Sequence, residues 1–344
     1  MIDGKISHSN LIFVGEEHTK RLCRHQVHAG NLMVARKGDV RKCVFITENE
    51  DGWMTGSDCL KVALKENYCY PRFIYYQLRS PFIGRWLEKI SIGATMPSIN
   101  TGLLSSIELV LPSLKEQKRI ADILSAYDDL IENNQKQIKL LEEAAQRLYK
   151  QWFIDLRYPG HETTKIVDVL PKGWRMGCVG EIAEFKRGKV ITKAQVAEGN
   201  VPVVAGGLEP AYYHNTANTT APVITVSGSG ANAGYSQLYN ENVFASDCSF
   251  ADVNTTPYVY FIYCLLKDKK TELDSLQKGA AQPHVYAKDI NALATLLPPE
   301  DILKLYTKYA SPYFEKVKAL KEQIKNLTQS RDRLLPKLMN GEIV

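Results

Sequence analysis

The sequence predicts an α+β fold in which a β-rich α/β domain and a long helix occur twice, with the two helices pairing as an antiparallel coiled coil. Two observations lead to this prediction. Over residues 113–157, apolar positions recur at alternating spacings of three and four, which is typical of a heptad seam. A shift of 186 residues carries this seam onto the C-terminal part of the chain. The protein is therefore expected to be a tandem repeat with pseudo-two-fold symmetry.

The residues predicted to pair the helices are aliphatic or aromatic. They are Ile120, Leu124, Tyr127, Ile131, Ile138, Leu141 and Leu148 in the first helix, and Tyr313, Val317, Leu320, Ile324, Leu327 and Leu334 in the second. Asn134 and Arg331 are the polar interruptions, which would fix register at some cost in stability. At 1.5 Å per residue, helices of about 40 residues are roughly 60 Å long. Apolar faces of that length are most simply buried against each other, although each helix could instead pack on its own domain.

The helices divide the chain into four predicted parts. These are a first β-rich domain over residues 1–112, a central helix over 113–159, a second β-rich domain over 160–298 and a C-terminal helix over 299–344. Ser113, with Glu116 three residues on, resembles a capping box at the start of the central helix. The Pro-Gly pair at Pro159 and Gly160 ends it. If the helices pair antiparallel, the domains lie at opposite ends of the coiled coil, as in a caliper.

Short apolar runs and turn residues predict the elements of the first domain. Strands are expected at residues 32–35, 44–47 and 107–111, and a helical stretch from Pro71 to Leu87. The second domain repeats several landmarks. Gly279-Ala280-Ala281-Gln282-Pro283 matches Gly93-Ala94-Thr95-Met96-Pro97 at the offset of 186, while Ser246-Asp247-Cys248 and Gly230 echo Ser57-Asp58-Cys59 and Gly38 at slightly larger offsets, which imply changes in loop length.

Composition sets modest limits on function. The chain has 344 residues and a net charge of +5, and its basic residues are spread out, so a polyanionic partner is favoured only weakly. Seven unclustered cysteines without a signal-peptide pattern predict a reduced, cytoplasmic protein. No apolar run approaches the roughly 18 residues that a membrane span requires, so no membrane association is expected.

Several motifs resemble a known family. The run Leu111-Pro112-Ser113-Leu114-Lys115-Glu116-Gln117-Lys118-Arg119-Ile120-Ala121-Asp122-Ile123-Leu124 resembles the start of the central helix in specificity subunits of type I restriction-modification systems. Asp128-Asp129-Leu130-Ile131-Glu132 and the tail over residues 333–343 resemble that family's helix interior and C-terminal signature. The Gly-x-x-x-Pro segments at Gly93 and Gly279 resemble the ends of its target recognition domains. The resemblance covers nearly the whole chain.

This resemblance implies a non-catalytic reader of double-stranded DNA. Each target recognition domain would read one half of an asymmetric, gapped sequence, and the helices would hold the halves apart. Methyltransferase (modification) subunits would dock on the assembly, and motor-nuclease (restriction) subunits can join it. Two other classes of function remain open, namely a coiled-coil scaffold whose shortened reader no longer binds DNA, and an autonomous enzyme.

The motif search argues against the enzyme. An adenine methyltransferase would carry Asn/Asp-Pro-Pro-aromatic, but Pro298-Pro299 follows Leu297 and precedes Glu300, and no phosphate-binding Gly-x-x-x-x-Gly-Lys-Ser/Thr loop occurs. The glycine-rich residues 228–233 precede a predicted strand rather than a helix, so we interpret them as a turn without a cofactor. Cys23, His25 and His28 lack a fourth ligand. No catalytic, cofactor or metal site is predicted.

Candidate DNA contacts are basic and hydrogen-bonding side chains at predicted loops. They are Lys20, Arg21, Arg24, Arg36, Lys37, Arg41 and Lys42 in the first domain, and Lys186, Arg187, Lys189, Lys193, His214, Asn215, Ser229 and Asn232 in the second. Lysine and arginine neutralise phosphates, and arginine also reads guanine edges. The alternative for each is an ordinary solvated loop residue.

The two domains differ at their beginnings. The second opens with Leu170-Pro171-Lys172-Gly173-Trp174-Arg175, which resembles the usual start of a target recognition domain. The first has no counterpart, because Met1-Ile2-Asp3-Gly4-Lys5-Ile6 resembles a place already inside such a domain. The first reader is therefore expected to be truncated, completed by another polypeptide, or a diverged short form.

Overall fold

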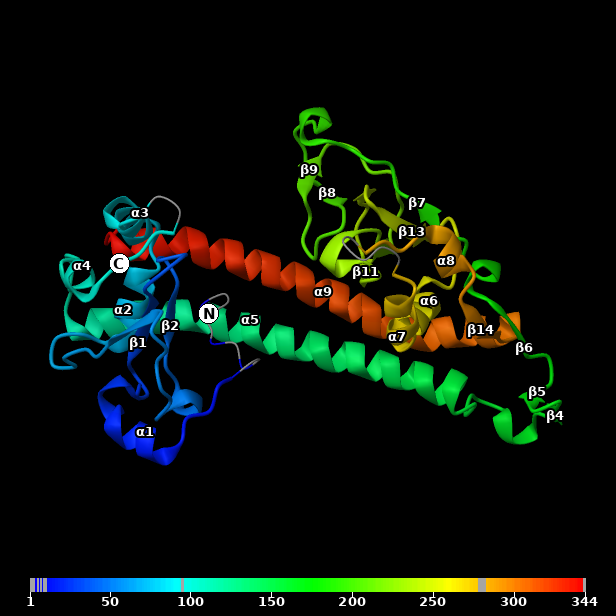
Figure 1. Cartoon of the computed structure of the whole chain (residues 1–344), viewed down its shortest axis with the longest axis horizontal. Coiled ribbons are helices and arrows are strands. Elements are labelled where there is room, and N and C mark those ends of the chain that lie inside the picture. The colour runs from blue at the N-terminus through cyan, green and yellow to red at the C-terminus, as the bar shows by residue number, and fades with distance from the viewer. Residues whose placement is uncertain are drawn as a thin grey trace. The chain divides into compact units, whose positions relative to one another are not determined.

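The structure is a computed structural model, which describes Gly4, Ile6, His8 and residues 11–93, 96–277 and 283–342. The chain forms two compact units. The first unit contains Met1–Asn134 and Gln323–Val344, and the second contains Gln135–Glu322. Each unit combines one β-rich domain with a part of each long helix (Figure 1). The predicted start at residues 1–6 and the two Gly-x-x-x-Pro segments lie partly outside the described residues.

Both long helices are present. Helix α5 spans Leu114–Tyr149 and continues through a π-helical turn, η3, at Lys150–Ile154, and α9 spans Glu300–Met339. The Ser113 side chain accepts a hydrogen bond from the Glu116 backbone N–H at 3.3 Å, which confirms the predicted N-cap. After η3 the backbone leaves the helical conformation, with a positive φ of 56° at Leu156.

In the first unit, α5 and α9 run antiparallel. Ile120 and Leu124 near the start of α5 share a buried cluster with Leu335 and Leu338 near the end of α9. Farther along, both polar interruptions of the seam have partners. Arg331 Nη1 lies 2.6 Å from Asp128 Oδ1, and Asn134 Nδ2 donates to Gln323 Oε1 at 3.3 Å. Partner numbers fall along α9 as they rise along α5, which is the antiparallel order.

The second unit pairs the helices through aromatic rings. The ring of Tyr306 lies 6.5 Å from that of Tyr149 and 5.6 Å from that of Trp152, measured between centroids. Tyr313 of α9 lies beside Leu140 and Leu148, which precede Tyr149 and Trp152 in α5, so the order is again antiparallel. The other predicted pairing residues are buried (Ile131, Val317, Leu320) or half-buried (Tyr127, Ile138, Leu141, Leu148, Tyr313, Ile324, Leu327, Leu334).

The domain of the first unit is a small antiparallel sheet covered by helices. Its elements are α1 (Glu16–Arg21), η1 (Cys23–His25), β1 (Leu32–Ala35), β2 (Cys43–Phe45), η2 (Glu48–Glu50), β3 (Cys59–Val62), α2 (Pro71–Leu78), α3 (Pro81–Ile90) and α4 (Thr101–Ser105). The strand order is β2-β1-β3. Phe73 and Ile74 of α2 pack with Leu32 and Val34 of β1 in the core that also holds Ile120 and Leu124.

The predicted helical stretch is present with a break, whereas the predicted strand over residues 107–111 is wrong. The helical stretch from Pro71 to Leu87 is two helices, because Pro81 has no N–H to continue the first, and Ser80 caps the second by accepting from the Ile83 N–H at 3.3 Å. Residues 107–111 do not form a strand, because no described segment pairs with them. A strand needs a neighbour to satisfy its backbone groups.

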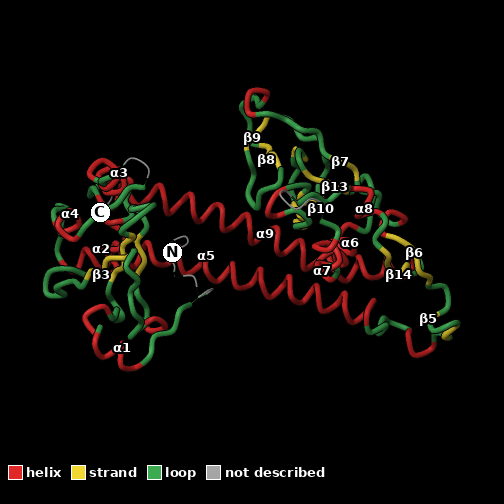
Figure 2. The backbone as a smooth tube through the Cα atoms, in the orientation of Figure 1, coloured by secondary structure: helices red, strands yellow, loops and turns green. Residues whose placement is uncertain are grey.

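The domain of the second unit is larger and richer in strands, which appear as short yellow segments in Figure 2. Its elements are η4 (His161–Thr163), β4 (Ile166–Val167), β5 (Leu170–Pro171), β6 (Arg175–Cys178), η5 (Val179–Glu181), β7 (Lys186–Arg187), η6 (Lys193–Gln195), β8 (Val201–Val204), β9 (Tyr212–His214), β10 (Val223–Ser227), η7 (Gly230–Asn232), β11 (Ser236–Tyr239), β12 (Phe244–Ala245), β13 (Cys248–Asp252), α6 (Val259–Asp268), α7 (Lys270–Ser275), α8 (Ala287–Asn291) and β14 (Ala294–Leu297). The main sheet has the order β11-β10-β13-β7, and β12-β8-β9 forms a second sheet.

The main sheets of the two units share topology and register. Val34 of β1 pairs with Leu60 of β3, as Val226 of β10 pairs with Ser249 of β13. On the other side, β1 pairs antiparallel with β2 as β10 pairs with β11. The second unit adds β7 beside β13, and a further small sheet pairs β14 with β6. The sequence repeat is therefore a repeat of tertiary structure.

Candidate nucleic-acid interface

In the second unit, a tight turn after β10 is held from two sides. The Ser229 hydroxyl donates a hydrogen bond to Asp247 Oδ2, just before β13. The Gly230 N–H donates to the Pro283 carbonyl at 3.0 Å, and the Val285 N–H donates to the Gly228 carbonyl at 3.1 Å. Gly230 has a φ of +78°, which glycine adopts without strain. Residues 228–230 and 283–285 thus form one rigid element, named here the second clamped turn.

The first unit contains the same element with different side chains. Lys37 Nζ lies 3.4 Å from Asp58, just before β3. The Gly38 N–H donates to the Pro97 carbonyl at 2.9 Å, and the Ile99 N–H donates to the Arg36 carbonyl at 2.9 Å. Gly38 has a φ of +77°. Residues 36–38 and 97–99 form the first clamped turn.

The two clamped turns hold unlike side chains on equivalent backbone. Lys37 bridges to Ser98 as Ser229 bridges to His284. The first turn therefore carries two cations, Arg36 and Lys37, and the second carries Gly228 and Ser229 beside His284. Sequence-specific binding needs this combination of a fixed frame and changeable side chains, because base edges are read by side-chain donors and acceptors held in place.

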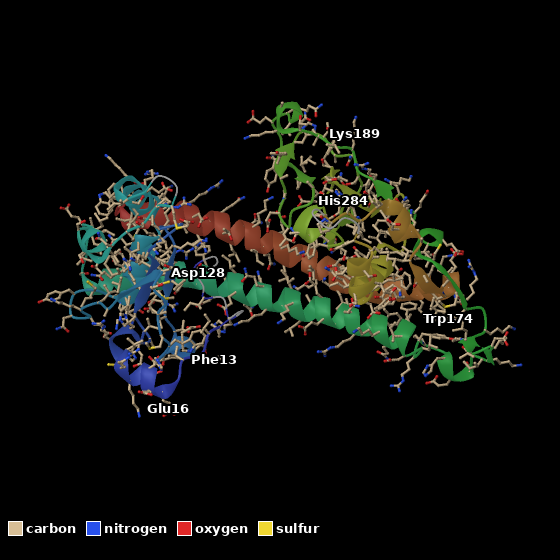
Figure 3. The ribbon with its side chains drawn as sticks, in the orientation of Figure 1. Phe13, Glu16, Asp128, Trp174, Lys189 and His284 are labelled. Carbon is tan, nitrogen blue, oxygen red and sulfur yellow. The ribbon has the colours of Figure 1, made fainter. Side chains whose placement is uncertain are left out.

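A pocket of about 220 Å³ lies beside the second clamped turn. Arg187 of β7, Gly228, Asp247, His284 and Tyr286 line it, so four segments distant in sequence meet there. The rings of His284 and Tyr286 stack at 6.0 Å with an angle of 12° between their planes. Figure 3 shows His284 in this unit. A cation, a carboxylate and two aromatic rings in one open pocket can bind the edge and the face of a base.

The same pocket contains a thiol that is unsuited to catalysis. Cys248 is only 2% exposed, and this burial raises the pKa of its thiol to about 12. The thiol stays protonated at neutral pH, so it is not an activated nucleophile. Among the residues that the structure describes, no group of three or more His, Cys, Asp and Glu side chains could hold a metal ion.

The predicted contacts Arg187, Ser229 and Asn232 are brought together around the second clamped turn. The Asn232 side chain donates to the Gly206 carbonyl at 3.3 Å and steadies the turn. Lys186 and Arg187 are exposed but lie in β7, which corrects the predicted loop, because they pair with Phe250 and Ser249 of β13. Lys189 follows on the surface of the same unit (Figure 3).

The remaining predicted contacts of the second unit lie elsewhere in the domain. Lys193 and Asn215 are exposed, in η6 and just after β9. The prediction that His214 lies in a turn is wrong, because it ends β9 and is 9% exposed. Its Nδ1 accepts a hydrogen bond from the Ala197 N–H at 3.0 Å, and its ring packs edge-on against Phe244.

The predicted cations of the first unit form two separate groups. Arg36, Lys37, Arg41 and Lys42 are exposed between β1 and β2. Arg41 lies 2.9 Å from Asp39 and 3.2 Å from Glu88 of α3, and its hydrogen bond holds the pKa of the Asp39 carboxyl below the usual value. Lys20 and Arg21 lie in α1 rather than in a loop, with Arg24 in η1. Figure 1 places α1 and α3 at opposite ends of this unit, so the structure does not bring the groups together.

Sequence reasoning missed the half of each clamped turn that follows the Gly-x-x-x-Pro segment. Ser98 and Ile99 come directly after Pro97, as His284 and Val285 come after Pro283. The motif itself is a sufficient signal, since its two copies are followed by different polar residues at the same offset of 186.

No helix in the described part of the chain is long and apolar enough to cross a membrane.

Comparisons with known proteins agree with one another. A family model described as the type I restriction modification DNA specificity domain matches residues 26–143 and 171–329. The MjaIX type I restriction enzyme specificity subunit of Methanocaldococcus jannaschii is 30% identical over 300 residues, which cover 79% of this chain and 68% of that protein. The HindI specificity subunit of Haemophilus influenzae is 22% identical over 386 residues, covering 87% and 83%. The crystal structure of a type I restriction-modification S subunit from M. genitalium has the same fold, with a TM-score of 0.59 and 21% identity over 91% of this chain and 84% of that one.

Proposed function

Because this chain belongs to the family of type I restriction-modification DNA specificity subunits, we propose that its two clamped turns are the elements that read the two halves of a gapped double-stranded target. Each turn presents its side chains from a backbone fixed by an aspartate on one side and a strand-like segment on the other. The proposal rests on one observation, which is that the same backbone arrangement occurs in both units with different side chains. Two halves of an asymmetric target require two readers that differ in this way.

The chemistry of each turn suggests how it contacts DNA. In the first unit, Arg36 and Lys37 offer charged donors, which suit phosphates and the guanine O6 and N7 acceptors. In the second unit, the Arg187 guanidinium offers several N–H donors. The Asp247 carboxylate accepts one hydrogen bond from Ser229 and has further lone pairs that can accept from a cytosine amino group. The flanking cations Lys186, Lys189 and Lys42 would neutralise phosphates around the two turns, and Arg41 would do so while paired with Asp39 and Glu88.

The subunit is proposed to bind without catalysing. The sequence lacks methyltransferase and nucleotide-binding motifs, and the pocket beside the second turn has no activated group. Methylation and cleavage are assigned to partner subunits, with methyltransferase subunits as the obligatory partner and restriction subunits as further ones. Turnover of DNA or ATP by the purified chain, retained through stringent purification, would contradict this assignment.

The test exchanges side chains between the two turns. Gly228→Arg with Ser229→Lys gives the second turn the cations of the first, and methylation by the reconstituted complex is then measured on a library of target sequences. We expect the preferred bases to change in one half-site and to stay the same in the other. Lys270→Ala, which removes a cation paired with Asp274 on α7, is the matched control and should leave both half-sites unchanged. Unaltered preferences in the exchanged variant would show that another element reads the bases.

A further inference from the structure

The two clamped turns place an aspartate at equivalent points of the backbone. The last residue of β1 pairs with the first residue of β3, and the last residue of β10 pairs with the first residue of β13. Asp58 and Asp247 directly precede β3 and β13. Their backbone carbonyls accept hydrogen bonds from the N–H groups of Arg36, at 2.8 Å, and Gly228, at 3.2 Å. The two carboxylates therefore occupy the same place in each reader.

The side chains that contact these two carboxylates differ. Lys37 Nζ lies 3.4 Å from Asp58 Oδ1, and both side chains are more than half exposed. At the equivalent place of the second turn, the Ser229 hydroxyl donates a hydrogen bond to Asp247 Oδ2. The lysine neutralises the charge of its aspartate, whereas the neutral serine leaves the charge of Asp247 in place. The first carboxylate is thus one half of an ion pair, and the second is a charged hydrogen-bond acceptor.

Base edges in the major groove distinguish a charged acceptor from an ammonium group. Cytosine presents an amino donor there, whereas guanine presents the O6 and N7 acceptors and thymine presents the O4 acceptor. Adenine presents an amino donor with the N7 acceptor beside it, so the second oxygen of a carboxylate would face a lone pair. A carboxylate therefore selects cytosine. An ammonium group, which has only donors, selects guanine or thymine.

The surroundings of Asp247 fit a cytosine–guanine pair. Arg187 lines the same pocket of about 220 Å³ as Asp247. The guanine of such a pair presents O6 and N7 next to the cytosine amino group, and an arginine can donate to both acceptors. The reversed pair would place acceptors against the carboxylate and a donor against the arginine. Together the two side chains therefore favour one orientation of one base pair.

We propose, as an extension that rests on the proposed function, that the middle residue of each clamped turn decides whether its aspartate reads a base. In the second reader, Ser229 leaves Asp247 able to accept from the amino group of a cytosine. In the first reader, Asp58 is a latent cytosine site that the Lys37 ammonium masks, and Lys37 donates to a base acceptor instead. Removing the lysine side chain exposes a cytosine reader in the first half-site.

The test is Lys37→Ser in the full chain, which gives the first turn the residue of the second. Duplexes are selected by binding from a randomised library, and the bound sequences are counted for the wild type and the variant. We expect one position of one half-site to change from guanine or thymine to cytosine, with cytosine enriched about tenfold over the wild type. The other positions should keep their bases, because the backbone hydrogen bonds that hold the turn do not involve the Lys37 side chain.

Three further variants separate this effect from the loss of a positive charge. Lys89→Ser removes another exposed lysine, on α3, and should change no base preference. Lys37→Ser combined with Asp58→Asn carries an amide, which presents a donor as well as an acceptor, so the cytosine enrichment should disappear. Asp247→Asn should reduce cytosine preference in the other half-site about tenfold, while its amide oxygen still accepts from Ser229 and holds the turn.

The outcomes separate this proposal from the proposed function. A change at one position of one half-site to a base other than cytosine would overturn the proposal and leave the clamped turn as the reader. Cytosine enrichment that persists in the double variant would also overturn it, because Asp58 would not be the acceptor. Unchanged bases in Lys37→Ser, or no selected half-sites with the wild-type chain, would contradict both. Cytosine enrichment that requires Asp58 is the result expected.

Discussion

The two helix junctions occupy equivalent places in the repeat but are built from different chemistry. In the first unit, Asp128 of α5 binds Arg331 of α9 and accepts from the Tyr76 hydroxyl at 2.7 Å (Figure 3). A shift of 186 residues converts Asp128 into Phe314, which stacks on Tyr260 with centroids 4.4 Å apart. The reverse shift converts Arg331 into Ala145, which is buried. One junction is specified by directional polar bonds and the other by ring packing.

This difference explains how two similar helices pair in a single register. Two similar helices could also pair in a shifted register, because their seams have the same period. An ion pair in the first unit and a ring cluster in the second make the junctions non-interchangeable. A register shifted by one heptad would place Ile324 or Leu338 opposite the Asp128 carboxylate in place of Arg331. An unpaired buried charge costs several kcal/mol, so the wrong arrangement is disfavoured.

The largest expected effect is at the aromatic junction. Tyr306 is fully buried and contacts the rings of Tyr149, Trp152, Phe153 and Phe261. Tyr306→Ala should destabilise the second unit by about 3–5 kcal/mol, because a large cavity remains. Hydrogen exchange of buried amides in the second unit measures the loss locally, since two units need not unfold in one step. Tyr309→Ala, at an exposed neighbour on α9, should cost under about 1 kcal/mol.

Disrupting the polar junction should cost less stability than disrupting the aromatic one. Introducing the residues of the second unit at the polar junction should restore part of the lost stability. Arg331→Ala leaves the Asp128 carboxylate without its cation, and we expect a loss of about 2 kcal/mol because the pair is only partly buried. The triple variant Tyr76→Ile, Asp128→Phe and Arg331→Ala gives these positions the residues of the second unit (Ile262, Phe314 and Ala145) and should recover part of that loss, since Ile74 stands where Tyr260 stacks on Phe314. Chemical denaturation and exchange of the α9 C-terminal amides report both. A triple variant less stable than Arg331→Ala would show that the first junction cannot accept ring packing.

DNA binding by the two units can be separated by removing cations. Replacing Lys186, Arg187 and Lys189 by Ala should lower affinity for all sequences by about tenfold to a hundredfold, and reduce the salt slope by up to about 2.7. The equivalent change of Arg36, Lys37 and Lys42 should have less effect, because the Lys37 ammonium is already paired with Asp58 at 3.4 Å. Fluorescence titration at several salt concentrations is the measurement. An unchanged slope in the first variant would mean that β7 faces away from DNA.

The smallest change in affinity is expected when both helices are lengthened. One heptad inserted after Gln137 in α5 and after Ala319 in α9 restores the same helical face and leaves both junctions intact. The helices lengthen by about 10.5 Å, so the optimal gap between half-sites should grow by roughly three base pairs at about 3.4 Å each. The accompanying rotation of about 100° should weaken binding modestly. A selection across spacer lengths gives the optimum, and an unchanged optimum in a folded variant would mean that other elements set the gap.

The sequence by itself determined the periodic and repeated features of this protein. A heptad seam of apolar residues favours a long helix with one buried face, so α5 and α9 follow from the seams over Ile120 to Trp152 and Tyr306 to Leu338 without knowledge of the tertiary structure. Local capping by Ser113 placed the start of α5, and the offset of 186 revealed the duplication together with the motifs of the family.

Only the tertiary structure decided the features that depend on contacts between distant segments. Residues 107–111 have the composition of a strand but pair with no described segment. His214 is buried at the end of β9, where the Ala197 N–H donates to its ring. The clamped turns join an aspartate, a glycine turn and the residues after a proline, whose spacing along the chain differs between the units because loops were inserted. Local propensity acts over a few residues, whereas strand pairing, burial and a binding surface are set by which segments meet in space.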